Sequence, residues 1–180
     1  MNETTTQAPT MAAPSVPVGQ GRWVSIRPIE RSDASRLSDF YARLSGESRR
    51  RRFLGPTPVL APELLRRFTA EGEGLVGVLF EHGPRDGAIV AHASVQPVAE
   101  GEAEIAFAVA DELQGRGLGR TLMREALDLA RARGHDRATA TLLADNAPMR
   151  RLIVGAGRPV ITDDLEAGIE EITVGLEAAA

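Results

Sequence analysis

The chain contains no cysteine, and it has no long run of apolar residues. The absence of cysteine excludes disulfide bonds, thiolate zinc sites and a covalent cysteine acyl-enzyme. It is compatible with a reducing compartment, so we expect a cytoplasmic protein. No apolar run approaches the roughly 18 residues that a membrane span requires, so we expect no membrane association.

Lysine is also absent: the 21 basic residues are all arginine, against 25 acidic residues, which gives a net charge of −4. An acidic chain lacks the basic surface that general nucleic-acid binding requires. We therefore expect no nucleic acid among the partners of this protein.

The length of 180 residues is that of one domain. Residues 1–21 are rich in Thr, Ala and Pro and show no periodicity, which predicts a disordered tail. No arginine precedes Arg22, so this tail lacks the charged start of a signal peptide. We expect residues 22–180 to form a single folded domain.

Hydrophobic patterning predicts the secondary structure of that domain. Strands are expected at residues 23–29, 75–81, 88–96, 102–109, 137–143, 159–162 and 171–176. Helices are expected after Ser32 as N-cap, at residues 62–68, from about residue 118 to Gly134, and from Asp145 to Gly157. Alternation in the strand at 102–109 places Glu104 on the opposite face from Ile105 and Phe107.

A loop with glycines at three alternate positions, Gly115, Gly117 and Gly119, joins this strand to an amphipathic helix. Glycine lets backbone N–H groups turn toward a ligand, and the first N–H groups of a helix lack internal partners. Such a loop can bind phosphate, although a turn without a ligand is the alternative. The loop lacks the lysine of a P-loop and the third glycine of a dinucleotide fingerprint.

The spacing of Gln114, Gly117 and Gly119 instead resembles the acyl-CoA pyrophosphate loop of the GNAT family of N-acetyltransferases. The order of expected elements is similar to that family over about residues 22–178. Shorter stretches resemble the Pat-type protein-lysine acetyltransferases: Arg27-Pro28 with Asp33, residues 103–106, and Leu143 with Asn146 and Met149. The resemblance implies a mixed α/β GNAT fold, with a mostly antiparallel sheet of about seven strands and about four helices.

The resemblance also implies acetyl-CoA as co-substrate and no metal. Backbone N–H groups near Val109 would hold pantetheine and polarise the thioester, and loop N–H groups would hold the pyrophosphate. Arg116 and Arg120 would add charge for the phosphates. The residues expected at the cofactor are Phe107, Ala108, Val109, Gln114, Gly115, Arg116, Gly117, Leu118, Gly119, Arg120, Thr121, Asn146 and Met149. Helix capping accounts for Asn146 equally well.

Glu104 is the candidate general base, because it is a carboxylate among alanines in an otherwise apolar strand. A surface-facing glutamate is the alternative. A hairpin centred on residues 98–101 would place Ser94 opposite Glu104, with His92 one pair further on. His92 is the alternative base, an orienting partner, or a hydrogen-bonded strand histidine. Many GNAT enzymes carry a tyrosine as general acid where this chain has Ile153, so the source of that proton stays open.

The Pat-type matches favour a protein lysine as the amine acceptor. A small-molecule amine, or a non-catalytic acyl-CoA-binding module, is the alternative, because a fold alone does not fix the substrate. The run Arg49–Arg52 is expected to form a solvated face. The expected partners are acetyl-CoA and the amine acceptor, for a monomer or a homodimer.

Overall fold

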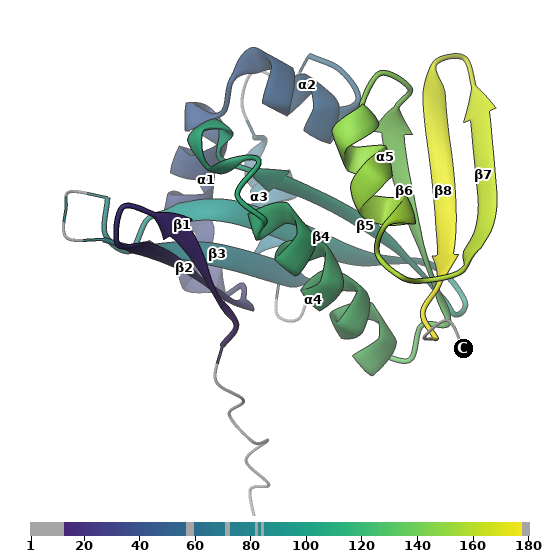
Figure 1. Ribbon diagram of the computed structural model, residues 1–180, viewed down its shortest axis with the longest axis horizontal. Helices are drawn as coiled ribbons and strands as arrows, with labels where there is room; N and C mark the ends of the chain where they lie inside the picture. The colour runs from purple at the N-terminus through teal and green to yellow at the C-terminus, as the bar shows by residue number, and fades with distance from the viewer. Residues whose placement is uncertain (1–12, 57–59, 71–72, 82, 84, 178–180) are drawn as a thin grey trace, which may run out of the picture.

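A computed structural model describes residues 13–56, 60–70, 73–81, 83 and 85–177. They form one eight-stranded sheet with helices against both faces (Figure 1). The strand order is β1-β2-β3-β4-β5-β6-β8-β7, and the β5–β6 pair alone is parallel among the described strands. The expected mixed α/β fold is confirmed, with eight strands and five α-helices in place of about seven and about four.

The element bounds follow the hydrophobic patterns closely in the middle of the chain. The strands are β1 (Ser15–Gly19), β2 (Arg22–Pro28), β3 (Gly74–Phe80), β4 (Ile89–Ala99), β5 (Glu102–Val109), β6 (Arg137–Leu143), β7 (Val160–Glu166) and β8 (Ile169–Gly175). The α-helices are α1 (Ala34–Arg43), α2 (Gly46–Phe53), α3 (Pro62–Phe68), α4 (Leu118–Ala132) and α5 (Ala147–Val154). Short 3₁₀ helices cover Arg31–Asp33 and Asp111–Leu113. No helix in the described part of the chain is both long and apolar enough to cross a membrane.

The core lies on both faces of the central strands. Helix α4 packs across β3 to β6 on one face, and α1 to α3 lie on the other (Figure 1). The stripe of α4 that faces the sheet is buried: Leu118, Leu122, Met123, Ala126, Leu127 and Ala130. A helix with such a wide apolar stripe is expected to pack on a sheet rather than against one other helix.

Part of the predicted disordered tail is a strand, which corrects the expectation for residues 15–19. β1 pairs antiparallel with β2, and the side chains of Val16 and Val18 are buried in the core. The Val18 carbonyl also accepts a hydrogen bond of 2.9 Å from Arg116 Nη1. Proline in the run obscured the alternation that marks an edge strand. Residues 1–12 of that prediction lie outside the described residues.

A buried carboxylate fastens β2 to the start of α1. Asp33 is fully buried and accepts two hydrogen bonds from the Arg27 guanidinium, of 2.7 and 2.8 Å, and one of 2.9 Å from the Glu30 N–H. Burial raises the pKa of Asp33, but these hydrogen bonds and the nearby arginine charges outweigh it, so the net shift is downward. Ser32, predicted as N-cap, lies inside the 3₁₀ helix instead.

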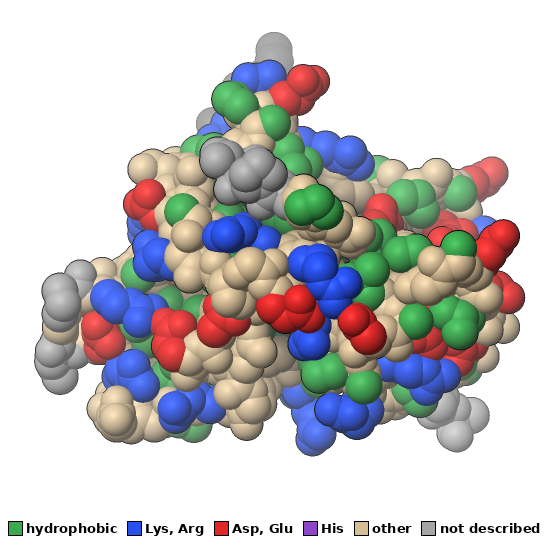
Figure 2. All heavy atoms as spheres, turned by 90° about the horizontal axis from the view of Figure 1, so that it is seen from above, with side chains coloured by type: hydrophobic (Ala, Val, Ile, Leu, Met, Phe, Trp, Pro, Cys, Tyr) green, Lys and Arg blue, Asp and Glu red, His purple; other side chains and the backbone are tan. Residues whose placement is uncertain are grey.

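Strand β7 forms the outer edge of the sheet beyond β8. All seven of its residues are exposed. Acidic and hydrophobic side chains gather at this end of the molecule in the view from above (Figure 2). The strand is longer than the 159–162 segment predicted for it, because the acidic residues that follow pair with β8.

We predict that Val18→Ala lowers the free energy of unfolding by about 1.5–3 kcal/mol, because it removes buried methyl groups and leaves a cavity. Urea denaturation measures the change. Ser15→Ala, at an exposed position of the same strand, serves as the control and should stay within about 0.5 kcal/mol of the unmodified protein. Equal stabilities of the two variants would contradict the placement of β1 in the core.

Candidate active site

The central opening of the sheet lies between β5 and β6. These strands pair at Glu102–Glu104 and Arg137–Thr139, yet β5 continues to Val109 and β6 to Leu143. Figure 1 shows the two strands diverging, and α2 contacts both of them. The second half of β5 therefore has a neighbouring strand on its β4 side alone.

The backbone of β5 presents hydrogen-bonding groups to this opening. The Ala110 N–H donates to the Val90 carbonyl of β4 at 2.8 Å. Because backbone groups in an antiparallel pair point alternately toward and away from the partner strand, those of Phe107 and Val109 point toward the opening. An extended ligand can pair with such an unpaired strand through its amide groups.

The glycine loop continues the opening at the start of α4. Gly115 and Gly117 have φ values of +73° and +84°, which side chains with a Cβ rarely adopt. The N–H groups of residues 115–119 donate to no described residue. Five donors in sequence at a helix N-terminus fit the pyrophosphate expected there. At Gly119 an added Cβ would come within 3.2 Å of Leu152, so this glycine lets α4 approach α5.

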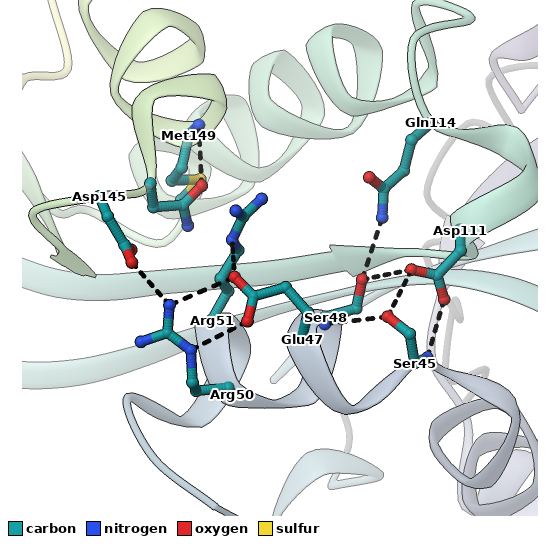
Figure 3. A network of polar contacts seen from close by, with 10 residues as sticks. Ser45, Glu47, Ser48, Arg50, Arg51, Asp111, Gln114, Asp145 and Met149 are labelled. Atoms are coloured by element: carbon teal, nitrogen blue, oxygen red, sulfur yellow. Dashed lines mark hydrogen bonds and ion pairs between the residues drawn. The ribbon is translucent and has the colours of Figure 1, made fainter.

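Two long side chains of the loop bind protein atoms. Gln114 Nε2 donates to the Val109 carbonyl at 3.1 Å. It also donates to Ser48 Oγ at 3.2 Å (Figure 3). Arg116 donates to Val18, as described, and to the Glu112 carbonyl at 3.2 Å. Both side chains therefore hold the loop in place. The backbone N–H groups of the loop, rather than these side chains, would be the main phosphate ligands.

The other expected cofactor residues differ in how they are placed. Leu118 is fully buried, Thr121 is half-buried and Arg120 is exposed. Asn146 caps α5, because its Oδ1 accepts a 3.3 Å hydrogen bond from the Met149 N–H. The structure thus shows the capping role of Asn146 that the sequence left open beside cofactor contact.

Helix α2 bridges the two sides of the opening (Figure 3). On the β5 side, Asp111 accepts hydrogen bonds from the Ser45 N–H (2.9 Å), Ser45 Oγ (2.8 Å) and Ser48 Oγ (2.6 Å). On the β6 side, Arg50 Nη2 lies 2.7 Å from Asp145 Oδ2. Burial raises the pKa of Asp111, but the hydrogen bonds from Ser48 and Ser45 bring the net shift downward. Helix α2 was not predicted from the hydrophobic pattern, although Ser45 as N-cap and arginines in the last turn are signals of a helix.

The arginine run of α2 is more than a solvated face. Arg49 Nη1 donates to the Leu44 carbonyl at 2.7 Å, and Arg50 and Arg51 form ion pairs with Glu47. Arg52 instead turns toward the sheet, where Nη2 donates to Ser94 Oγ at 2.9 Å. The expectation of a solvated face is therefore corrected for Arg52 above all.

The predicted partner of Glu104 across the hairpin was wrong by two residues. Gln96, not Ser94, lies opposite Glu104, and Ser94 lies opposite Ala106. β4 continues to Ala99 and β5 begins at Glu102, so the turn is shorter and lies further along the chain than the expected 98–101. An irregularity between residues 97 and 99 then shifts the register by one residue. The Glu104 side chain is half-buried and forms no hydrogen bond or ion pair with the residues that the structure describes.

His92 lies opposite Ala108, four residue pairs from Glu104 on the same face, and is fully buried. Its Nδ1 lies 2.8 Å from the Tyr41 hydroxyl. Burial, with a smaller effect of the Arg52 charge, lowers the pKa of His92 well below its ordinary value. A neutral histidine that is closed off from solvent is placed for packing and hydrogen bonding.

The sequence model of the acetyltransferase (GNAT) family matches residues 41–156. Acetyltransferase PA5475 of Pseudomonas aeruginosa is 34% identical over 142 residues, which cover 76% of this chain and 75% of that protein. Acetyltransferase Pat of Mycolicibacterium smegmatis is 32% identical over 166 residues, 88% of this chain; the chain spans about half of that relative, 48% of its length. The chain belongs to the GNAT family and is an N-acetyltransferase by class.

Solved structures agree with this assignment. The GNAT domain of S. lividans PAT superimposes with a TM-score of 0.78 at 28% identity, over 94% of this chain and 99% of that one. The acetyltransferase yncA of Salmonella typhimurium, solved with acetyl-CoA, gives a TM-score of 0.63 at 21% identity over 87% of this chain and 96% of its own. At that identity the likeness concerns the fold alone.

We predict that Gly117→Asp weakens acetyl-CoA binding at least tenfold, which is about 1.4 kcal/mol, measured by calorimetry. The substitution strains a positive-φ position and adds a negative charge beside the expected pyrophosphate. Gly134→Asp is the matched control, since Gly134 has a similar φ of +85° at the far end of α4. Equal affinities of the two folded variants would refute the loop assignment.

Proposed function

We propose that the protein transfers the acetyl group of acetyl-CoA to a protein lysine, by direct attack of the amine in a ternary complex. The observation that carries this proposal is the position of Glu104. It is a half-buried carboxylate on β5, at the last residue pair before β5 and β6 separate. Ala106 and Ala108 follow on the same face, and their small side chains leave room for an acceptor.

Acetyl-CoA fits the opening described above. The unpaired N–H groups of Phe107 and Val109 would hold pantetheine and polarise the thioester carbonyl, and those of residues 115–119 would hold the pyrophosphate. The match to the acetyltransferase (GNAT) family supports this choice of co-substrate, and the structural neighbour yncA was solved with acetyl-CoA. The co-substrate supplies an activated acyl group, and the chain supplies position and proton acceptance.

Glu104 would act as general base. An amine attacks only in its neutral form, and a lysine with a pKa near 10.4 is almost fully protonated at neutral pH. Glu104 would accept the proton as the new N–C bond forms and the C–S bond breaks. The CoA thiolate would leave unprotonated or take a proton from water. His92 remains the rival base, although its burial and its contact with Tyr41 favour Glu104.

The choice of a protein lysine rests on the likeness to Pat. The chain shares 32% identity with the mycobacterial Pat over most of its own length and superimposes on the PAT domain of S. lividans. The acceptor surface and the activity of the whole protein are part of this proposal. Incubation with radiolabelled acetyl-CoA and cytosolic proteins, beside a panel of small amines, tests it. Label on proteins supports the proposal, and label on small amines alone overturns it.

The absence of lysine makes this labelling assay easier to interpret. The chain has no lysine, so it should remain unlabelled apart from its N-terminal amine. Label that appears on a protein can then be assigned to a partner rather than to the enzyme.

We predict that Glu104→Gln reduces kcat by about 10²–10⁴ at neutral pH, the range for a positioned base. Acetyl-CoA affinity should stay the same, and raising the pH should recover part of the loss because more amine is neutral. Glu100→Gln, in the exposed turn before β5, is the control and should retain activity. If His92→Gln loses activity while Glu104→Gln keeps it, the base is His92.

A further inference from the structure

Two side chains of β4 on the acceptor face each accept a hydrogen bond from an arginine. Arg52 Nη2 donates to Ser94 Oγ at 2.9 Å, and Arg67 Nε donates to Gln96 Oε1 at 2.6 Å. Gln96 lies opposite Glu104, and Ser94 lies one position further along the same face. Same-face positions of a strand are about 7 Å apart, so both anchoring side chains lie close to the proposed base.

The charge of Arg52 has no carboxylate partner in the described part of the chain, whereas Arg50 and Arg51 of the same helix pair with Glu47. The Nε of Arg52 is buried and has no hydrogen-bond acceptor among the described residues. The guanidinium carbon lies 5.1 Å from the ring centroids of both Phe53 and Phe68, so the group is held between two aromatic rings. Ser94, which accepts its hydrogen bond, is neutral.

The charged groups near Arg52 are the proposed base Glu104, on the neighbouring strand, and Arg67. Arg67 lies near a carboxylate, because the Gln96 amide that it contacts also donates to Glu73. Tyr41 and His92 pack beside Arg52, and its charge counteracts the rise that burial causes in the pKa of Tyr41. Half-buried cations are normally neutralised by an anion, and arginine is the residue that binds carboxylates through two parallel hydrogen bonds.

We propose that Arg52 binds a carboxylate of the acceptor, so that the enzyme selects lysines with an acidic residue beside them. This inference rests on the proposed function, because it assigns the acceptor to the face of Glu104. Ser94, which Arg52 contacts, lies two residues, about 7 Å, along β4 from Gln96, the residue opposite Glu104. An extended peptide also advances about 3.3 Å per residue, so the carboxylate belongs about two positions from the lysine. Arg52 is then a specificity-determining residue, and Ser94, Phe53 and Phe68 hold its guanidinium in position.

The test uses two blocked peptides with one lysine each, identical except for Asp or Asn two residues from that lysine. For the unmodified enzyme we expect kcat/KM to be about tenfold higher for the Asp peptide, mainly through a lower KM. Arg52→Gln should abolish this preference and leave the Asn peptide nearly unaffected. Arg51→Gln, which removes a charge that pairs with Glu47 within the same helix, is the matched control and should keep the preference.

Three outcomes would overturn the proposal: equal kcat/KM for the two peptides, a preference that survives Arg52→Gln, or an equal loss for both peptides in that variant. Melting temperature and acetyl-CoA affinity identify a folding defect, and in that case Arg52→Lys is used. Lysine keeps the charge without the planar fork, so a reduced preference is expected. If neither peptide is acetylated by the unmodified enzyme, the proposed function fails rather than the role of Arg52 within it.

Discussion

The pairing of β5 with β6 ends after three residue pairs, and the arrangement of the site depends on where it ends. A buried strand edge with unsatisfied N–H groups is costly unless a ligand or water completes its hydrogen bonds. Asp111 and Asp145 attach α2 to the two separating strands, so the width of the opening is fixed by hydrogen bonds and an ion pair. An extended ligand can therefore bind to the backbone N–H and C=O groups of β5 that have no partner strand on the β6 side.

The parts predicted from the sequence are those with local signals. The apolar stripe of α4, the glycines before it and Gly134 after it lie within one continuous segment, and the structure has the helix within two residues of the expected bounds. Alternation placed Glu104 on the face opposite Ile105 because a strand has a period of two. The likeness of Arg27 and Asp33 to a family pattern also has a physical cause, since the two residues form a buried bidentate pair.

The parts that could not be predicted depend on contacts between distant segments. The exact position of the turn and a one-residue irregularity beside it together place Gln96 opposite Glu104, and the hydrophobic pattern marks neither. The position of Arg116 in the glycine loop predicts a phosphate ligand, but its guanidinium donates to a carbonyl of β1, about a hundred residues away in the sequence. The sequence predicts that Arg52 is one of four solvated arginines. Its contacts with Ser94 of β4 and Phe68 of α3 depend on how these distant segments pack together.

The exposed edge strand β7 also affects how molecules meet in solution. It carries exposed hydrophobic side chains at Val160, Ile161 and Leu165. An exposed edge with such side chains favours pairing with a strand of another molecule. Acidic residues 163, 164 and 166 lie among them, and a second copy paired antiparallel would bring acidic side chains together. Like charges directly opposite destabilise a strand pair, so this edge resists polymerisation of identical chains while staying compatible with a basic or neutral strand.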